Sequence, residues 1–375
     1  MKILITGGAG FIGSSLAKAL VVRGDTVTVL DNLSPQIHGA SPSESPLLRE
    51  LPDDVRFIKG DVRSADDWAK ALEGQEAVVH LAAETGTGQS MYQVDHYVET
   101  NIRGTSLLLD HLAHHPHSVR RVVVASSRSI YGEGKYRGPS GHVYPGMRNA
   151  DDMRRGQFEC LCADTGEPLQ VVATDETSKT HPSSVYGITK LVQEQLALMT
   201  CGAMGIGAAA LRFQNVYGPG QSLRNPYTGI LSIFSTLLLQ GKDINIFEDG
   251  EETRDFVYIN DVVEAIVLAM DAEHAQQAVY NVGSGVATSV LEVAETLKRI
   301  YGATGQLKVT GDFRLGDIRH NFADVSKIRD ELGFQSSVSF RDGATRFCEW
   351  VKSQTIEDAG YERSVAEMRA RGLMK

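Results

Sequence analysis

The feature that most constrains the fold is a glycine-rich turn that joins the first strand-like run to the first helix-like run. Lys2–Thr6 is apolar and favours a strand, and Phe11–Arg23 has apolar residues at helical spacing. Between them, Gly7, Gly10 and Gly13 are spaced as GxxGxxG. Such glycines allow a tight turn, a close approach of a phosphate to the backbone, and close packing of the helix on the strand. The amides at the helix N-terminus then face the phosphates of a dinucleotide.

Strand-like and helix-like runs continue to alternate through roughly the first half of the chain. Further strands are expected at 26–30, 55–59, 77–81, 119–125 and 207–212, and helices at 65–72, 95–115 and 185–199. Such βαβ units predict an α/β protein with a Rossmann doubly wound parallel sheet. We expect this domain to span residues 1–212, with an irregular insertion at about 132–180. Residues 213–375 are expected to form mainly a smaller substrate-binding lobe, with some segments returning to the Rossmann core.

An acidic residue, Asp31, follows the second expected strand. A carboxylate there accepts hydrogen bonds from the ribose hydroxyls of the adenosine half and repels the 2′-phosphate of NADP. The next residue is Asn32 rather than an arginine that could bind that phosphate. The sequence therefore predicts NAD as the cofactor, bound by the three glycines, by Phe11 and Ile12 of the turn, and by Asp31 and Asn32.

A tyrosine and a lysine four residues apart provide the candidate chemistry. Tyr186 and Lys190 lie on one face of the helix expected at 185–199. A free tyrosine has a pKa near ~10 and is a poor base at neutral pH, but a neighbouring ammonium and a positive nicotinamide ring both favour the phenolate. Ser127, at the end of the strand run 119–125, is the expected hydroxyl partner. Ser127, Tyr186 and Lys190 are therefore the predicted catalytic residues, and the last two are also expected to contact the cofactor.

These motifs together resemble the extended short-chain dehydrogenase/reductases that act on nucleotide sugars. The glycine turn, Ser127 four residues before Tyr131, and the YxxxK pair carry the resemblance, which extends over nearly the whole chain. It implies a nucleotide-sugar substrate and a homodimer. It also implies further cofactor contacts at Asp61, Val62, Leu81, Ala82, Ala83 and Asn101. The substrate contacts that it implies are Thr85, Ser127, Asn215, Arg254 and Arg319.

Three reactions of that family compete: C4 epimerisation, 4,6-dehydration, and net oxidation or reduction. The dehydratases carry an Asp-Glu pair just after the catalytic hydroxyl, whereas this sequence has Arg128 and Ser129 there. Epimerisation is therefore the expected reaction, with Tyr186 as the base and NAD as the hydride acceptor. A nucleotide-sugar dehydrogenase or reductase and a non-catalytic NAD-binding module remain as alternatives.

The length of the insertion narrows the expected substrate. Ser127 and Tyr186 are 59 positions apart, which is longer than is usual in relatives of this kind. The insertion, the segment Gln221–Gly229 and the charged C-terminal tail resemble the subgroup that converts dTDP-L-rhamnose to dTDP-6-deoxy-L-talose. UDP-glucose and UDP-N-acetylglucosamine remain as alternative substrates. The insertion could line the sugar pocket, cover it as a lid, or be a surface excursion without a role.

Charge and composition argue against several other classes. A net charge of −10 does not favour nucleic acid as a partner. No run is long and apolar enough to span a membrane, and four cysteines are too few for a disulfide framework, so a cytoplasmic protein is expected. Cys160 and Cys162 lack a second cysteine pair with metal-ligand spacing, and the histidines at 111–117 sit at a helix end. We therefore expect no metal site.

Overall fold

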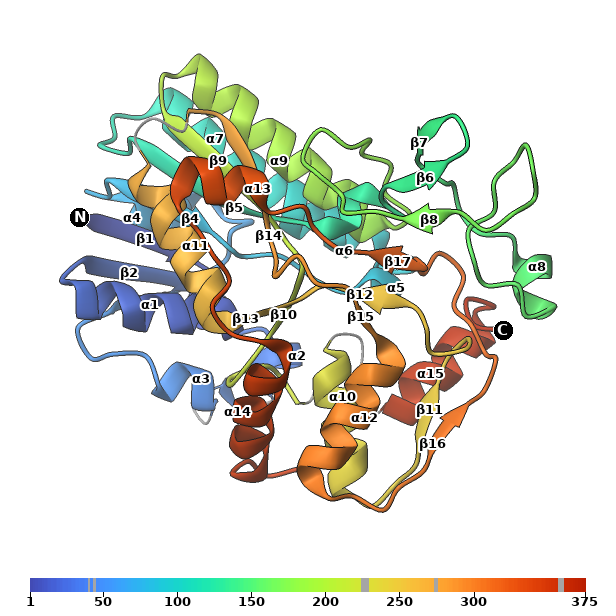
Figure 1. Cartoon of the computed structure of the whole chain (residues 1–375). Coiled ribbons are helices and arrows are strands. Elements are labelled where there is room, and N and C mark those ends of the chain that lie inside the picture. The colour runs from blue at the N-terminus through green and yellow to red at the C-terminus, as the bar shows by residue number, and fades with distance from the viewer. Residues whose placement is uncertain (40, 43–44, 224–228, 273–275, 357–360) are drawn as a thin grey trace.

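A computed structural model describes residues 1–375 apart from 40, 43–44, 224–228, 273–275 and 357–360. Its centre is a seven-stranded parallel sheet with the strand order β14-β9-β5-β4-β1-β2-β3 (Figure 1). The strands are β1 (Lys2–Thr6), β2 (Thr26–Asp31), β3 (Arg56–Lys59), β4 (Ala77–His80), β5 (Arg121–Ser127), β9 (Gly207–Phe213) and β14 (Ala278–Val282). The predicted fold class is confirmed.

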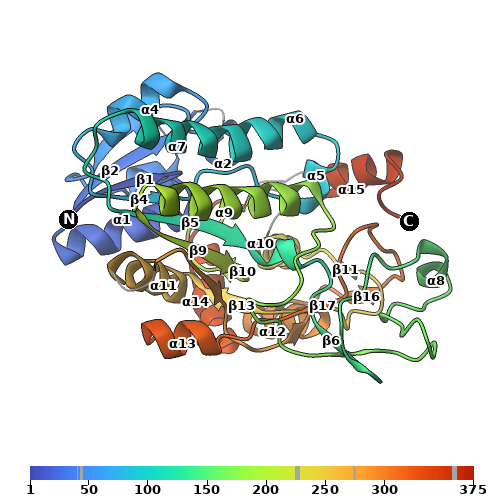
Figure 2. The same ribbon diagram turned by 90° about the horizontal axis from the view of Figure 1, so that it is seen from above.

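Helices cover both faces of this sheet (Figure 2). One face carries α4 (Ala65–Leu72), α7 (Gly104–His114) and α9 (Val185–Ala203), and the other carries α1 (Phe11–Arg23) and α11 (Ile259–Asp271). Along β1, Ile3 and Ile5 pack into the core on the α1 side and Leu4 packs into the core beneath α4 and α7. Both faces are thus buried, which explains why the strands read as apolar runs rather than alternating ones.

The expected bounds of β1, α1 and α4 agree with the structure, whereas the long helix expected at 95–115 is wrong in detail. It is divided into α6 (Val94–Tyr97), a π-helical segment η2 (Val98–Arg103) and α7. Asn101 lies in the π-helical segment, completely buried, and its side chain bonds to the loop after β4 and to α9. Such long-range side-chain contacts have no signature in the helical periodicity.

The insertion folds as a small antiparallel sheet with one short helix. After the 3₁₀ turn η3 (Arg128–Tyr131) come β6 (Tyr136–Gly138), β7 (Gly141–Val143), α8 (Ala150–Arg154) and β8 (Gln170–Val171), with β6 between β7 and β8. Its own core is a cluster of Tyr136, Cys160, Cys162 and Leu169. The two cysteines of the insertion, like Cys201 and Cys348, are free and buried.

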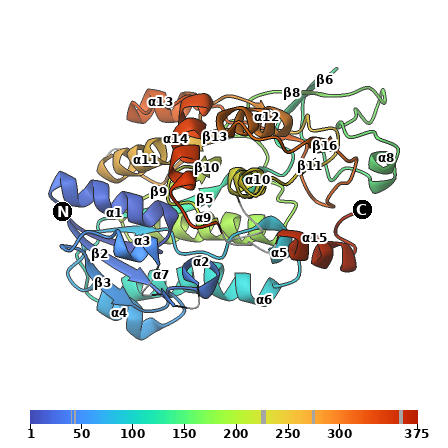
Figure 3. The same cartoon turned by 90° about the horizontal axis from the view of Figure 1, so that it is seen from below.

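The second lobe lies beyond the carboxyl ends of the main sheet (Figures 1 and 3). Its larger helices are α10 (Ile230–Leu239), α12 (Val290–Tyr301), α14 (Phe340–Lys352) and α15 (Tyr361–Ala370). Its strands pair as β10 (Asn215–Tyr217) with β13 (Phe256–Tyr258), β11 (Ile244–Ile246) with β16 (Leu307–Val309), and β12 (Thr253–Arg254) with β15 (Thr288–Ser289) and β17 (His320–Asn321). The short helices α2 (Pro35–His38), α3 (Pro46–Arg49), α5 (Thr87–Ser90) and α13 (Ser326–Leu332) complete the fold.

Several segments beyond residue 212 return to the main sheet or to its helices, and α11 is one of them. β14, which lies beyond residue 212, adds the strand at one edge of the sheet by pairing with β9. At the other side, Figures 2 and 3 place α15 next to α5, where the Met368 sulfur approaches Gly88. Within the described residues, we find no helix with the length and hydropathy that a membrane span requires.

Candidate functional site

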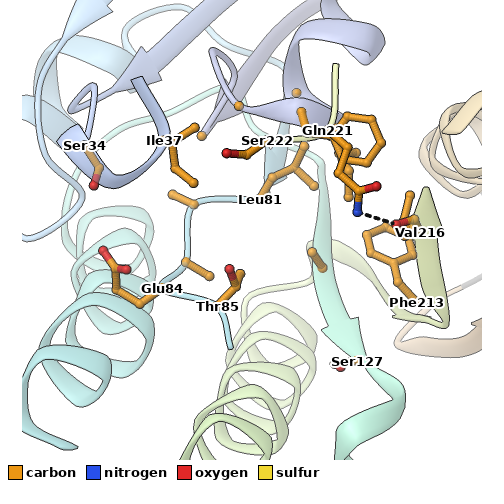
Figure 4. Close-up of a pocket in the computed structure, with 18 of the residues that line it drawn as sticks. Ser34, Ile37, Leu81, Glu84, Thr85, Ser127, Phe213, Val216, Gln221 and Ser222 are labelled. Carbon is orange, nitrogen blue, oxygen red and sulfur yellow. Dashed lines mark hydrogen bonds between the residues drawn. The ribbon is translucent and has the colours of Figure 1, made fainter. Parts of the chain in front are cut away.

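A cavity of about 410 Å³ opens where the central strands of the sheet end (Figure 4). Ile37 and Ser222 lie above the open space in this view, and Glu84 and Thr85 lie below it. Its walls come from the turn after β1 and from the carboxyl ends of β2, β4, β5 and β9. The crevice outside the carboxyl ends of parallel strands is where open α/β sheets bind their ligands.

The glycine turn forms the floor of this first cavity because it has no side chains to fill the space. Gly7 has a φ of 66°, and its amide donates to the Leu30 carbonyl at 2.8 Å. A Cβ on Gly7 would lie 2.9 Å from the Ala82 nitrogen, and one on Gly13 would lie 2.5 Å from the Gly8 Cα. The turn therefore accepts only glycine at both positions, and its bare backbone faces the cavity.

Asp31 ends β2 at the rim of the first cavity. Its carboxylate accepts hydrogen bonds from the Ala9 amide at 3.0 Å and the Leu33 amide at 2.8 Å. Burial raises the pKa of Asp31, and the two amides and nearby His38 oppose that rise. The carboxylate thus fastens the glycine turn to the end of β2 while one edge of the residue lines the cavity.

Most of the predicted cofactor residues line the first cavity. They are Gly7, Gly10, Phe11, Ile12, Gly13, Asp31, Asn32, Val62, Leu81, Ala82, Ala83, Tyr186 and Lys190. Asp61 and Asn101 do not. Asp61 pairs with Arg63 at 2.8 Å, which lowers the pKa of Asp61 to about 2, and it accepts from Asn32 at 3.2 Å. Asn101 bonds to the Glu84 backbone, so each of the two residues holds a lining residue, Asn32 or Glu84, in place.

The three predicted catalytic residues are brought together at the inner end of the first cavity. Ser127 ends β5, and Tyr186 and Lys190 lie in the first turns of α9. The α9 N-terminus is set by Ser184, whose hydroxyl accepts from the Gly187 amide at 3.1 Å. A Cβ on Gly187 would lie 2.7 Å from the Ser129 carbonyl oxygen, so only glycine lets α9 approach the segment after β5 this closely.

Burial dominates the protonation of this group. Burial raises the pKa of Tyr186, whereas the nearby Ser127 hydroxyl and the charge of Arg128 lower it. Burial lowers the pKa of Lys190 to about 7, and its ammonium donates to Gln193 Oε1 at 2.8 Å. Besides Lys190, which the sequence predicts as an activating charge, the structure places a second cation, Arg128, near the Tyr186 phenol.

A second cavity of about 330 Å³ adjoins the first. The walls that the two cavities share are Thr85, Ser127, Tyr186, Phe213, Gln214, Asn215, Gly229 and Ile230. Arg128 lies next to Ser127 of this shared wall, and the far wall carries Arg254, Arg314, Asp317, Glu248 and Glu252. Burial raises the pKa of Glu252 to about 7. The arrangement can hold a long ligand whose reacting part meets Tyr186 and whose anionic part meets several guanidinium groups.

Arg319, a predicted substrate residue, lines neither cavity. Its side chain is 1% exposed and pairs with Glu159 at 2.6 Å, Asp249 at 2.7 Å and Glu248 at 3.0 Å. Arg314, five positions earlier in the same segment, lines the second cavity instead and lies 4.9 Å from the Phe247 ring centroid. The sequence carried a signal for an arginine in this segment but not for which of the two faces the cavity.

The insertion supports the second cavity from outside. None of residues 132–180, all of which are described, lines either large cavity. Arg148 instead pairs with Glu248 at 2.7 Å and with Glu133 at 3.3 Å, and Glu248 lines the second cavity. Of the three roles left open for the insertion, lining these cavities is not what the structure shows, and its buried charges instead hold the loop that forms a wall.

Comparisons with known proteins agree with this geometry. A model described as the NAD dependent epimerase/dehydratase family matches residues 3–147 and 159–283. A dTDP-L-rhamnose 4-epimerase of Burkholderia thailandensis is 39% identical over 356 residues, covering 94% of this chain and 95% of that protein.

Two similar solved structures are epimerases with bound ligands. UDP-glucose 4-epimerase of Thermotoga maritima with UDP-glucose has a TM-score of 0.75 and 30% identity, covering 94% of this chain and 99% of that one. UDP-glucuronic acid 4-epimerase of Bacillus cereus with UDP-glucuronic acid and NAD has a TM-score of 0.76 and 27% identity, with the same coverages.

The buried charges around Arg319 lead to a prediction about stability. Arg319→Met should lower the free energy of unfolding by about 2–4 kcal/mol, because it leaves several carboxylates without their counter-charge, two of them still partly solvated. Arg154→Met, which removes an exposed pair with Asp151, should change it by less than about 0.5 kcal/mol. Urea denaturation of both variants measures the difference. Equal stability of the two variants would contradict the structural role of Arg319.

Proposed function

Because the chain belongs to the NAD-dependent epimerase/dehydratase family, we propose that it inverts C4 of dTDP-L-rhamnose through a 4-keto intermediate, giving dTDP-6-deoxy-L-talose. The observation that carries the reaction type is the meeting of Ser127 and Tyr186 where two cavities join. Arg128 and Ser129 stand where dehydratases of the family carry the acid pair for elimination. The identity to the Burkholderia thailandensis epimerase supports the sugar.

NAD is the cofactor, and the first cavity fits it. The bare glycine backbone leaves room for the pyrophosphate, and the start of α1 directs amides toward it. In our proposal Asp31 accepts the adenosine ribose hydroxyls, and Val62, Leu81, Ala82 and Ala83 pack against the adenine and the pyrophosphate. Asp61 and Asn101 stay proposed cofactor residues, and their bonds hold Asn32 and Glu84 in the wall of this cavity.

The chemistry is divided between the cofactor and three side chains. Bound NAD supplies the acceptor and the donor of the C4 hydride. Tyr186 Oη accepts the proton of the C4 hydroxyl and returns it after the keto sugar has presented its opposite face. Ser127 bridges the phenol and the C4 oxygen. Lys190 holds the nicotinamide ribose.

The second cavity accommodates the nucleotide sugar. Arg254 and Arg314 lie at its far wall and Asn215 on the wall that both cavities share, and guanidinium groups suit phosphate oxygens. Near the reacting end, Phe213 and Ile230 give the shared wall an apolar part beside its polar residues. A 6-deoxy sugar has a methyl at C6, and apolar walls suit it better than a hydroxyl. Most of this cavity comes from the proposed substrate lobe, residues 213–375.

The segment Gln221–Gly229 contributes only partly to what can be described. Gln221 and Ser222 line the first cavity, and Gln221 donates to the Val216 carbonyl at 3.3 Å (Figure 4). Residues 224–228 lie outside the described residues.

UDP-glucose or UDP-N-acetylglucosamine as the epimerised sugar, and net oxidation or reduction, stay as the competing assignments. The expected cytoplasmic location also stays a prediction.

We propose that one exposed apolar face forms the interface of a homodimer. On α6 and η2 it includes Val94 and Val98, and on α9 it includes Ile188 and Met199. α9 packs against both α6 and η2, so these residues belong to neighbouring elements (Figure 2). A second copy related by a two-fold axis would cover this face with its own equivalent, which is the commonest form of association.

The role of Asp31 predicts the cofactor preference. Asp31→Asn should weaken NAD binding by about 10–100-fold, because a neutral amide replaces a charged hydrogen-bond acceptor, and should reduce the discrimination against NADP. Calorimetric titration of cofactor-depleted protein measures both affinities. Asp53→Asn, at an exposed position, is the matched control. An unchanged NAD affinity in Asp31→Asn would remove this contact from the proposal.

The substrate assignment predicts a product. Incubation of purified protein with dTDP-L-rhamnose should give dTDP-6-deoxy-L-talose by NMR without added reductant, and kcat/KM should exceed that for UDP-glucose and UDP-N-acetylglucosamine. Tyr186→Phe should lose ~10²–10⁴-fold in rate, since it lacks the proton acceptor. A clear preference for a UDP-sugar would replace the substrate, and near-normal turnover by a folded Tyr186→Phe would replace the base.

The proposed dimer predicts that a charge at Met199, but not one at Val22, changes the oligomeric state. Light scattering should give twice the chain mass for the native protein, and Met199→Glu should shift it toward monomer, because a carboxylate would be buried between copies. Val22→Glu is the control, since Val22 is also exposed but lies on α1. A native monomer, or equal behaviour of both variants, would contradict the proposed interface.

A further inference from the structure

Arg128 occupies an unusual place in the second cavity. It follows Ser127 directly and begins the 3₁₀ turn η3, which starts where the Ser127 hydroxyl accepts from the Ser129 amide at 3.2 Å. Its Nε donates to Asn215 Oδ1 at 2.7 Å, and this bond fixes the plane of the guanidinium. Within the described part of the chain, its two terminal nitrogens have no hydrogen-bond partner, and the residue lines the cavity. Donors held ready in a cavity wall imply a ligand oxygen.

Charged groups of both signs surround Arg128, because the second cavity is lined by Arg254 and Arg314 and also by Glu248, Glu252 and Asp317. Burial and the nearby charge of Arg254 lower the pKa of Arg128 to about 9, while Asp317 and the phenol of Tyr186 oppose that fall. Arg128 therefore stands between the reacting tyrosine and the arginine of the far wall. A cation that is disfavoured in the empty cavity gains most when negative charge develops beside it.

Tyr186 is the group that needs such a charge. The groups that face it are Ser127 from β5, Arg128 from η3 and the ring of Tyr97 from α6, edge-on at 6.5 Å between centroids. Lys190, on α9 itself, donates to Gln193 Oε1, and its pKa of about 7 means that its charge is lost as the pH rises through neutrality. Arg128 keeps its charge up to about pH 9.

We propose that Arg128 is a fourth catalytic residue: its guanidinium, fixed by Asn215 and directed into the sugar cavity, stabilises the negative charge shared by Tyr186 and the C4 oxygen. This inference rests on the proposed C4 epimerisation. The proton moves from the C4 oxygen to Tyr186 Oη and later returns, and Arg128 neither gains nor loses a proton. Arg128 occupies the position at which the dehydratases carry an acidic residue. In our proposal it assists proton transfer at C4, and no elimination takes place.

The test compares Arg128→Gln and Arg128→Lys with the native enzyme, with Arg137→Gln as control because Arg137 is exposed on β6 of the insertion. Arg128→Gln should lower kcat by roughly 10²-fold at neutral pH while KM changes little. The base must be ionised, and loss of the cation raises its pKa, so the rising limb of kcat against pH should move to higher pH. Arg128→Lys should recover part of both effects, because it keeps the charge but not the planar bond to Asn215.

A second measurement tests the effect of the Arg128 charge on the pKa of Tyr186 and does not require turnover. The phenolate absorbance of Tyr186 is obtained as the difference between a protein with Tyr186 and its Tyr186→Phe variant during a pH titration. In the Arg128→Gln background this difference should titrate at higher pH than in the native background. Inactivity of the native protein toward every nucleotide sugar would remove the proposed function, and this titration would still decide on Arg128.

Two results would overturn the role of Arg128. One is native kcat and an unshifted pH limb or phenol titration in Arg128→Gln. The other is an effect on KM alone, which would make Arg128 only a binding contact. Retained NAD and an unchanged melting temperature in both Arg128 variants show that the comparison is made on folded enzyme. Loss of fold in Arg128→Gln would leave Arg128→Lys, with the same two readouts, to decide.

Discussion

The position of the proposed base depends on a buried ion pair between Glu194 and Arg212. Glu194 lies two turns after Tyr186 on α9, and Arg212 lies near the end of β9; their side chains meet at 2.5 Å. Glu194 also accepts from Ser126 at 2.6 Å, and Arg212 donates to Tyr131 Oη at 2.7 Å. One cluster thus ties α9 to β9, to the end of β5 and to the turn after it, which fixes Tyr186 relative to Ser127.

A second set of buried ion pairs fixes the position of the far wall of the sugar cavity. Arg148 and Arg319 both pair with Glu248, which has a φ of 49° and sits in a loop that lines the cavity. Burying charges is unfavourable unless each is paired, so the insertion and the loop must keep one relative position. The insertion therefore affects the substrate through the shape of the wall.

The sequence was sufficient wherever function depends on local geometry. The glycine turn, Asp31 and the Tyr186–Lys190 pair are each set by a few adjacent residues, and the structure places all of them around one cavity. The sequence was insufficient where the site depends on contacts between residues that are far apart in the chain. Arg314 faces the cavity and Arg319 does not, in a segment that has no periodicity to tell them apart. Part of the difference comes from residues at the end of the chain, because Arg314 forms an isolated antiparallel bridge with Met374.

The same burial that excludes water from the reacting groups also lowers the pKa of Lys190. Its pKa is about 7 in the folded protein against 10.5 in the unfolded chain, so between these values the unfolded state binds the extra proton. Stability therefore falls as the pH drops from about 10.5 to about 7 and is level below that. Negative charge placed nearby opposes this loss, because it restores the proton on Lys190. Arg128, by contrast, stays charged across this range, up to about pH 9. The site thus combines a lysine whose charge changes near neutral pH with an arginine whose charge is constant there, and this arginine opposes the rise that burial causes in the pKa of Tyr186.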